Sequence, residues 1–374
     1  MWQVPVKLEQ AVHAAASEVV GAAALATGAL TRAIVDRSRR YTSDRAELAR
    51  PSDRVGDLAA RAAFFTIADA MKIGVPLAEL VARDALPPAR PLRVIDLGAG
   101  CGAMTLGLLA ALPPIALDVL AIDHDRDALR IASAACRAFA ADRVLTLTTR
   151  AEDVARASLP PAELIVMGSV LNELAPERAL AVVEQALAAL TGDGAVIIIE
   201  PALRETSRAL HAIRDQVIAR GSGHVFAPCT RRAAPCTALV DPRDWCHEDR
   251  ALALPPRTAE LARLTHLRDG GMRFSYLVLR KQPLSLVEDP AAWRIVSAPF
   301  PAKGKLELIG CSEHGRVRLR LLRRHRNAGN RAFEDADRGS VLAISCEPEP
   351  GAALERLEID AETTVRTPGE TPGL

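Results

Sequence analysis

The stretch that decides the fold is Val94-Ile95-Asp96-Leu97-Gly98-Ala99-Gly100-Cys101-Gly102. An aliphatic run ends in an acid, a glycine-rich turn follows, and helical spacing begins near Ala103. Glycines let the backbone turn sharply and approach a ligand closely. A dinucleotide fingerprint would place its third glycine one residue later, and Asp96 would repel a pyrophosphate. The same carboxylate suits a ligand that carries positive charge.

Short aliphatic runs alternate with helical stretches on both sides of this turn. The predicted strands are Leu92–Leu97, Val119–Asp123, Val144–Thr148, Leu164–Gly168 and Ala195–Glu200. The predicted helices are Thr105–Ala111, Arg126–Ala140, Pro176–Leu190 and Arg204–Arg220. This alternation predicts an α/β fold with a doubly wound, mainly parallel sheet.

A second strand ends in an acid at Asp123, 27 residues after Asp96. A carboxylate there can accept hydrogen bonds from both hydroxyls of a ribose. Two strand-end acids beside a glycine turn favour S-adenosylmethionine, and the run resembles motif I of class I methyltransferases. In the third loop Arg150 stands where an acid is common, which leaves Glu152 as the candidate near the adenine. The predicted cofactor-binding residues are Asp96, Gly98, Gly100, Gly102, Asp123 and Glu152.

The segment after the fourth strand bears on the acceptor of the methyl group. It reads Gly168-Ser169-Val170-Leu171-Asn172-Glu173-Leu174 and lacks the Asn/Asp-Pro-Pro-aromatic motif that grips a flipped base. The strands ending at Gly168 and Glu200 also carry no cysteine for attack on a pyrimidine. Two familiar base-methylating chemistries are therefore disfavoured, and the sequence assigns no catalytic residue.

The rest of the chain divides by composition. Residues 1–90 are predicted to form a helical region. Residues 91–282 are predicted to form a methyltransferase-like domain with a cysteine-rich insertion at 221–256. Within it, Leu261–Leu267 and Phe274–Arg280 flank a Gly-Gly turn and predict a pair of strands. Residues 283–346 predict a small β-rich module, and the composition of 347–374 predicts a disordered tail.

Composition excludes several classes of protein. The formal net charge is +1, which argues against a protein that coats RNA over its whole surface, and aromatic residues make up only 3%. The longest early apolar run, Val19–Leu30, is shorter than the roughly 20 residues of a membrane-spanning helix. We expect a cytoplasmic protein of bacterial type, without signal peptide or membrane anchor, that acts as a monomer.

Three cysteines fall within eighteen residues, at Cys229, Cys236 and Cys246. Their segment is irregular and has no core of its own, so coordination of a metal would supply the energy that orders it. A fourth ligand is required, and His224, His247, Cys311 and Cys346 are the candidates. The spacing alone leaves zinc and iron–sulfur both open.

An ordered series of short motifs carries a family resemblance. The series is Glu200-Pro201, Pro228-Cys229, Pro235-Cys236, Asp244-Trp245-Cys246-His247, Ser275-Tyr276-Leu277 and Cys311-Ser312-Glu313-His314-Gly315. With Ser169–Leu174, it resembles the methyltransferase-like family of small-ribosomal-subunit assembly factors, over about residues 50–325. The resemblance implies a 4Fe–4S cluster on Cys229, Cys236, Cys246 and Cys311, and a role on the immature small subunit.

A basic segment points to an RNA partner independently of that resemblance. Residues 303–331 hold nine Lys or Arg against Glu307 and Glu313. Arg316, Arg318 and Arg320 alternate, so on a strand they share one side and can neutralise phosphates of small-subunit ribosomal RNA.

Three functions fit these patterns. The first is an iron–sulfur protein that binds S-adenosylmethionine and methylates ribosomal RNA. The second is a non-enzymatic assembly factor that keeps the methyltransferase fold. The third is a small-molecule methyltransferase whose cysteine loop is a zinc-bound lid, which the basic segment and the motif order disfavour.

Overall fold

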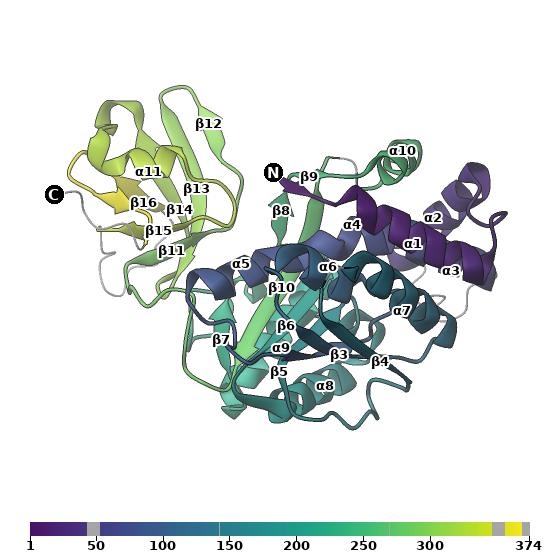
Figure 1. Cartoon of the computed structure of the whole chain (residues 1–374). Helices are drawn as coiled ribbons and strands as arrows, with labels where there is room; N and C mark the ends of the chain where they lie inside the picture. The colour runs from purple at the N-terminus through teal and green to yellow at the C-terminus, as the bar shows by residue number, and fades with distance from the viewer. Residues whose placement is uncertain (43–52, 142, 269, 346–355, 369–374) are drawn as a thin grey trace.

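The computed structural model describes residues 1–374 except 43–52, 142, 269, 346–355 and 369–374. Its centre is an eight-stranded sheet in the order β4-β3-β2-β5-β6-β10-β7, with β8 paired to β10 (Figure 1). Its strands are β2 (Leu92–Leu97), β3 (Leu117–Asp123), β4 (Leu145–Ala151), β5 (Ala162–Gly168), β6 (Leu190–Pro201), β7 (His224–Ala227), β8 (Glu248–Arg250) and β10 (Met272–Arg280).

The first five strands of this sheet run parallel, and β10 reverses the direction. β4, β3, β2, β5 and β6 pair in parallel, whereas β10 is antiparallel to β6, β7 and β8. The prediction of a doubly wound, mainly parallel α/β sheet is confirmed. The carboxyl ends of the parallel strands therefore lie at one edge, where such sheets bind their ligands.

Helices cover both faces of the sheet. Two of them, α6 (Ala103–Ala111) and α7 (Arg126–Ala140), belong to one apolar core, and α8 (Pro176–Ala189) and α9 (Arg204–Arg220) to another. Val94 joins the first core and its neighbour Ile95 the second, because successive strand residues point to opposite faces. A parallel sheet buried on both sides explains why its strands are almost continuously aliphatic.

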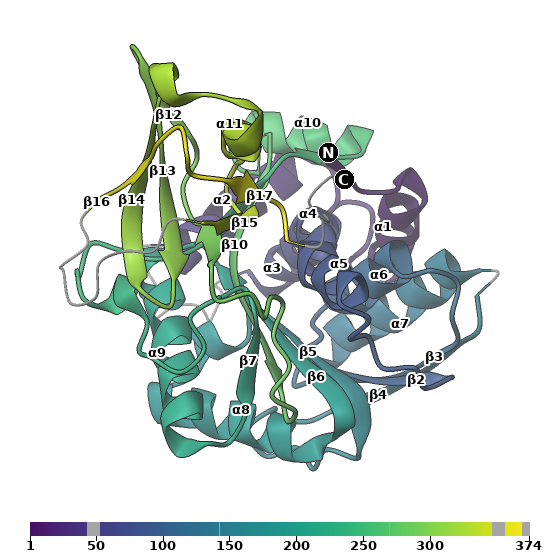
Figure 2. The same ribbon diagram turned by 90° about the vertical axis from the view of Figure 1, so that its left-hand side faces the viewer.

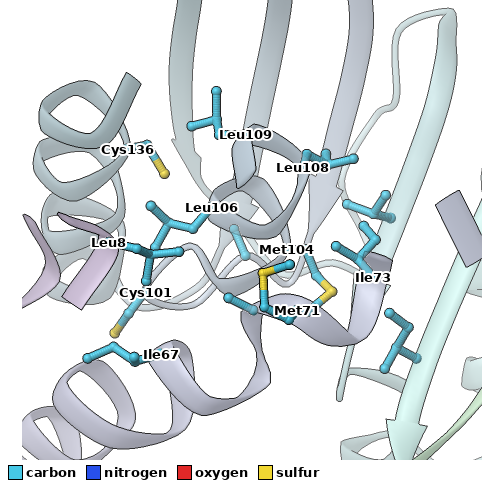
Figure 3. Close-up of a cluster of buried hydrophobic side chains, with 14 of the residues drawn as sticks. Leu8, Ile67, Met71, Ile73, Cys101, Met104, Leu106, Leu108, Leu109 and Cys136 are labelled. Carbon is cyan, nitrogen blue, oxygen red and sulfur yellow. The ribbon is translucent and has the colours of Figure 1, made fainter. Parts of the chain in front are cut away.

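The N-terminal region forms a cover on the α6–α7 side. It comprises β1 (Trp2–Gln3), α1 (Val6–Val20), α2 (Thr27–Thr42), α3 (Arg54–Ala60), η2 (Arg61–Thr66), α4 (Ile67–Asp69), η3 (Ala70–Ile73) and α5 (Gly74–Ala82). Leu8, Ile67 and Met71 pack in one core with Met104 and Leu106 of α6 (Figure 3). Apolar burial thus fixes the cover to the sheet domain.

A later segment completes the cover. β9 (Leu252–Ala253) pairs in parallel with β1, and α10 (Pro256–Thr265) follows it. The strand predicted at Leu261–Leu267 is therefore wrong. Pro256 occupies the first turn of a helix, where a proline is favoured, and Leu261 and Ala262 are buried against the cover.

The C-terminal module has its own sheet of seven strands, in the order β16-β14-β13-β11-β15-β17 with β12 paired to β13. They are β11 (Ala292–Ile295), β12 (Phe300–Ala302), β13 (Lys305–Ser312), β14 (Gly315–Leu322), β15 (Val341–Ile344), β16 (Arg356–Ile359) and β17 (Val365–Arg366). Trp293 is buried in the apolar core of this module. Figure 2 shows that the β13–β14 hairpin extends toward α9.

The segment expected to be a disordered tail differs from that expectation in part. β16 pairs with β14, and β17 pairs with β15, so both strands belong to the module. Leu357, Ile359 and Val365 are buried in its core. Residues 347–355 and 369–374 lie outside the described residues. No helix in the described ranges has both the length and the apolar character to cross a lipid bilayer.

Candidate cofactor cavity and cysteine site

A cavity of about 1250 Å³ opens at the carboxyl ends of the parallel strands. Gly98, Asp123, Gly168 and Pro201 line it where β2, β3, β5 and β6 end. The N-terminal cover supplies the facing wall, with Arg37, Tyr41, Asp57, Arg61, Phe65, Thr66, Asp69 and Lys72. Small-molecule sites usually measure about 300–1,000 Å³, so this space accommodates a nucleoside cofactor and part of a second molecule.

The glycine turn after β2 forms the floor of the cavity. The backbone has positive φ at Gly98 (78°) and Gly100 (52°), a conformation that favours glycine. A Cβ at Gly98 would collide with the side chain of Val170. Gly102, also at positive φ, begins α6 away from the cavity, and its missing Cβ leaves room for Ala132.

Asp123 lines the cavity and is held in place by backbone groups. Its Oδ2 accepts a hydrogen bond from the N–H of Gly100 (2.8 Å), and its Oδ1 accepts one from the N–H of Asp125 (2.9 Å). These bonds join the end of β3 to the glycine turn. Each carboxylate oxygen keeps a further lone pair, which suits the ribose hydroxyls expected here.

Asp96 lies behind the glycine turn instead of on the cavity wall. It is completely buried, and its Oδ2 accepts from the backbone N–H (3.1 Å) and the hydroxyl (2.6 Å) of Thr105. Its buried Oδ1 has no hydrogen-bond partner among the described residues. Burial raises the pKa of Asp96 to about 6. Asp96 thus anchors α6 beneath the turn, and its contact with a cofactor stays a prediction.

The third loop places a different acid from the expected one in the cavity. Asp153 lines the wall, whereas Glu152 does not and lies 3.8 Å from Arg150. The N–H of Glu152 donates a hydrogen bond to the carbonyl of Asp123 (3.0 Å), which joins the third loop to the end of β3. No sequence motif distinguishes these two neighbouring acids.

The cover contributes residues that the sequence motifs missed. Arg61 Nη1 donates to Asp125 Oδ2 (2.6 Å), so the cover reaches the acids that follow β3. Tyr41 donates its hydroxyl to Glu173 (3.1 Å) and accepts from Arg37 (2.9 Å). Only helical spacing marked this region in the sequence, and helical spacing carries no information about ligands.

Two buried groups with shifted pKa values flank the cavity near β6. Glu200 accepts from the N–H groups of Val170 (3.1 Å) and Leu171 (2.9 Å), and burial raises its pKa to about 7. Lys72 lies 2.8 Å from Asp69, and burial lowers its pKa to about 8. Both groups therefore titrate closer to neutrality than usual.

The four cysteines of the predicted metal site come from four segments. Cys229 follows β7, Cys236 precedes the short helix Thr237–Leu239, Cys246 precedes β8, and Cys311 lies on β13. Hydrogen bonds between protein groups hold these segments together. Thr230 donates to the carbonyl of Cys311 (2.8 Å), and Ser275 donates to the carbonyl of Cys246 (2.7 Å). The hairpin and the cysteine loop thus meet through their own contacts.

The thiols lie within electrostatic reach of one another. Burial raises the pKa of Cys236 to about 11 and that of Cys311 to about 12, and the charge of Cys229 adds to both increases. Burial also raises the pKa of Cys246, with contributions from the other three thiols. Among the described residues, however, no three His, Cys, Asp or Glu side chains are placed to hold a single metal ion.

Two arginines flank this group of thiols. Arg214 of α9 is 2% exposed and donates to the carbonyls of Arg231 and Ala234, between Cys229 and Cys236. Arg316 stands opposite Cys311 in the β13–β14 pair and lies 3.1 Å from Asp244, two residues before Cys246. Positive charge on both sides favours sulfur atoms that are negatively charged.

The predicted basic strand is β14. Arg316, Arg318 and Arg320 do alternate along β14, but each has a carboxylate partner. Arg316 pairs with Asp244, Arg318 with Glu307 (3.4 Å) and Arg320 with Glu358 (2.5 Å). Arg316 points to the cysteine site, and the other two are partly neutralised.

The strand order with a reversed β10, the glycine turn and the acid at the end of β3 define the class I S-adenosylmethionine-dependent methyltransferase fold. A family model described as mitochondrial small ribosomal subunit Rsm22 matches residues 73–341, and the chain belongs to this family. It is accordingly a methyltransferase-like protein of the small ribosomal subunit. The match includes every predicted cofactor and metal residue.

Several solved structures of methyltransferases are distantly similar to this chain. Magnesium protoporphyrin IX methyltransferase from Synechocystis, with bound S-adenosylmethionine, is 13% identical, with 67% of this chain and 97% of that chain covered and a TM-score of 0.37. The plantazolicin methyltransferase is 10% identical, with 72% and 99% covered and a TM-score of 0.37. Neither comparison bears on substrate. No curated protein matches the chain.

Proposed function

We propose that this protein binds S-adenosylmethionine in the cavity, carries a 4Fe–4S cluster on four cysteines, and methylates RNA of the small ribosomal subunit during its assembly. The observation that carries the proposal is the meeting of the glycine turn and Asp123 at a large cavity, in a chain of a small-subunit family.

The residues of the cavity fit the cofactor. Gly98, Gly100 and Asp123 face it, Asp96 and Gly102 support the turn from behind, and Glu152 stands at the loop beside Asp153. S-adenosylmethionine supplies the methyl group when bound. An acceptor aligned with that methyl group would receive it, with S-adenosylhomocysteine as the other product and the acceptor's proton passing to water. Alignment of the two molecules is the main requirement, so no catalytic acid or base is assigned.

For the cysteine site we propose an iron–sulfur cluster in preference to zinc. Cys229, Cys236, Cys246 and Cys311 influence one another electrostatically, yet they are not gathered around one ion. A four-iron cluster separates its thiolates more widely than a tetrahedral zinc ion does. With four thiolates the cluster is an anion, and Arg214 and Arg316 would offset its charge.

Binding to small-subunit ribosomal RNA, as a monomer, completes the proposal. Arg323 and Arg324 are exposed at the end of β14 and show no acidic partner among the described residues, unlike the three arginines before them. The cytoplasmic location expected from the sequence stays a proposal, because the family is described from mitochondria.

Anaerobic purification tests the three parts separately. Wild-type protein should be brown, contain about four irons per chain, bind S-adenosylmethionine in calorimetry and co-sediment with immature small subunits. Cys311→Ser should lose the iron, whereas Cys136→Ser, in the core beside α1, should keep it. A colourless protein with one zinc would contradict the cluster.

Transfer of a labelled methyl group to the small-subunit RNA tests the activity. Binding of cofactor and subunits without transfer would instead support the non-enzymatic assembly factor. That second candidate is favoured by the described ends of β5 and β6, which carry neither a nucleophilic cysteine nor a base-gripping motif.

A further inference from the structure

S-adenosylmethionine carries a carboxylate as well as its two positive groups. The acids on the cavity wall, among them Asp123, Asp125 and Asp153, suit its hydroxyls and cationic groups. They would repel its carboxylate. A cation on the wall with hydrogen-bond donors to spare is therefore needed to hold that end of the molecule.

Most cations of the cavity wall are already committed to other partners. Arg37 donates to both oxygens of Asp57 (2.8 and 3.0 Å) and to Tyr41. Lys72 and Arg268 share Asp69, and Arg273 donates to Asp249. Arg54 and Arg61 remain among the described lining residues, and Arg54 is exposed at the start of α3.

Arg61 combines partial burial with unused donors. Its side chain is 20% exposed, and Nη1 donates to Asp125. Nε and Nη2 have no acceptor in the part of the chain that the structure describes. Nη2 lies 3.5 Å from the point where Gly100 would carry a Cβ, so the free side of the guanidinium faces the glycine turn.

The backbone that carries Arg61 is unusual. Arg61 begins η2, a six-residue π-helix between α3 and α4. Wide turns of this kind are rare and occur frequently at functional sites. The same segment also contributes Phe65 and Thr66 to the cavity wall. Local structure and unused donors therefore point to the same residue.

We propose that Arg61 binds the carboxylate of S-adenosylmethionine and so closes the N-terminal cover on the cofactor. A planar guanidinium matches a carboxylate with two parallel N–H···O bonds, which an ammonium cannot do. The inference rests on the proposed function in one respect, that this cofactor binds in this cavity. Arg61 precedes the residues that match the family model, so the family match says nothing about it.

Calorimetry with two ligands tests the assignment. Decarboxylated S-adenosylmethionine keeps the sulfonium, the amine and the nucleoside and lacks only the carboxylate. Wild-type protein should bind the complete cofactor about tenfold to a hundredfold more tightly, the effect of a hydrogen-bonded charge pair. Arg61→Met should lose this preference and bind the decarboxylated ligand as wild type does. Arg61→Lys should give an intermediate preference.

Arg54→Met is the matched control, because Arg54 lines the same cavity from an exposed position. It should keep the wild-type preference. If Arg61→Met still prefers the complete cofactor as strongly as wild type, the assignment of Arg61 is overturned while the cofactor site stands. If wild-type protein binds neither ligand, cofactor binding itself is overturned. Retained binding of the decarboxylated ligand shows that Arg61→Met is folded.

Discussion

Glu200 is the residue whose protonation should govern the response of stability to pH. It is 2% exposed at the end of β6, and its pKa of about 7 lies above the usual value of 4.5 because of burial. The folded protein therefore holds this proton more tightly than the unfolded chain does. The free energy of unfolding should fall as the pH rises from about 4.5 to about 7.

Replacement of Glu200 by Gln should flatten that pH dependence. Wild type should lose about 3 kcal/mol at most through this group, and the Gln variant should lose markedly less. Some dependence should remain, because burial raises the pKa of Asp96 in the same direction. Urea denaturation across this pH range measures the effect, with Glu205→Gln, exposed on α9, as control. Equal slopes in wild type and Glu200→Gln would contradict the prediction.

The position of a site residue could be predicted from the sequence where it depends only on the end of the strand that carries the residue. Asp123 lies in the cavity as expected, because a residue at the carboxyl end of a parallel strand must lie at that edge. Asp96 turned inward because Thr105, nine residues later, supplies two donors. No sequence motif could indicate Arg61, because its partner Asp125 is 64 residues away in the chain.

Whole elements followed the sequence best where hydrophobic periodicity was long. The helices Arg126–Ala140 and Arg204–Arg220 have the predicted bounds. α10 was missed because its short apolar run Leu261–Leu267 reads equally well as a strand. β16 pairs with β14 across more than thirty residues of sequence, and local sequence holds no trace of such a distant partner.

Strand β14 allows the cysteine site to be tested at the level of an element. Arg316 faces Cys311 across the hairpin, whereas Arg318, two residues on, pairs with Glu307. Arg316→Met should retain less iron than wild type in the presence of a chelator, because a positive charge beside the thiolates is lost. Arg318→Met should retain as much as wild type. Iron assays on anaerobic protein compare the two variants. Equal retention of iron would show that Arg316 does not stabilise the cluster.

At the scale of the whole molecule, a buried arginine is a central contact between the β module and the rest of the chain. Arg294 of β11 donates to Glu79 of α5 (2.6 Å), to Glu248 of β8 (2.8 Å) and to Tyr276 of β10 (3.0 Å). It is 3% exposed. Besides the contacts of the hairpin with the cysteine loop, the orientation of the module thus depends on a charge that satisfies three partners away from water.

Arg294→Met should destabilise the protein severely. Glu79 would stay in the interior without its cation, and Glu248 would keep only Arg250, at a cost of about 3–5 kcal/mol. Arg320→Met, which removes a partly exposed pair with Glu358, should cost about 1 kcal/mol or less. Urea denaturation distinguishes the two, and limited proteolysis between residues 283 and 291 should accelerate only in Arg294→Met. Similar stabilities for both variants would show that the module docks by other means.

The pairing of β1 with β9 sets the order in which the molecule can be completed during synthesis. Trp2 pairs with Leu252, and Glu9 accepts two hydrogen bonds from Thr258 (2.7 Å each), so early residues wait for partners made about 250 positions later. At about 5–20 residues per second, that wait lasts on the order of 10–50 s. The parallel strands can already have assembled by then. The edge of the cover at which β1 pairs with β9 is therefore completed only after all the parallel strands have been made.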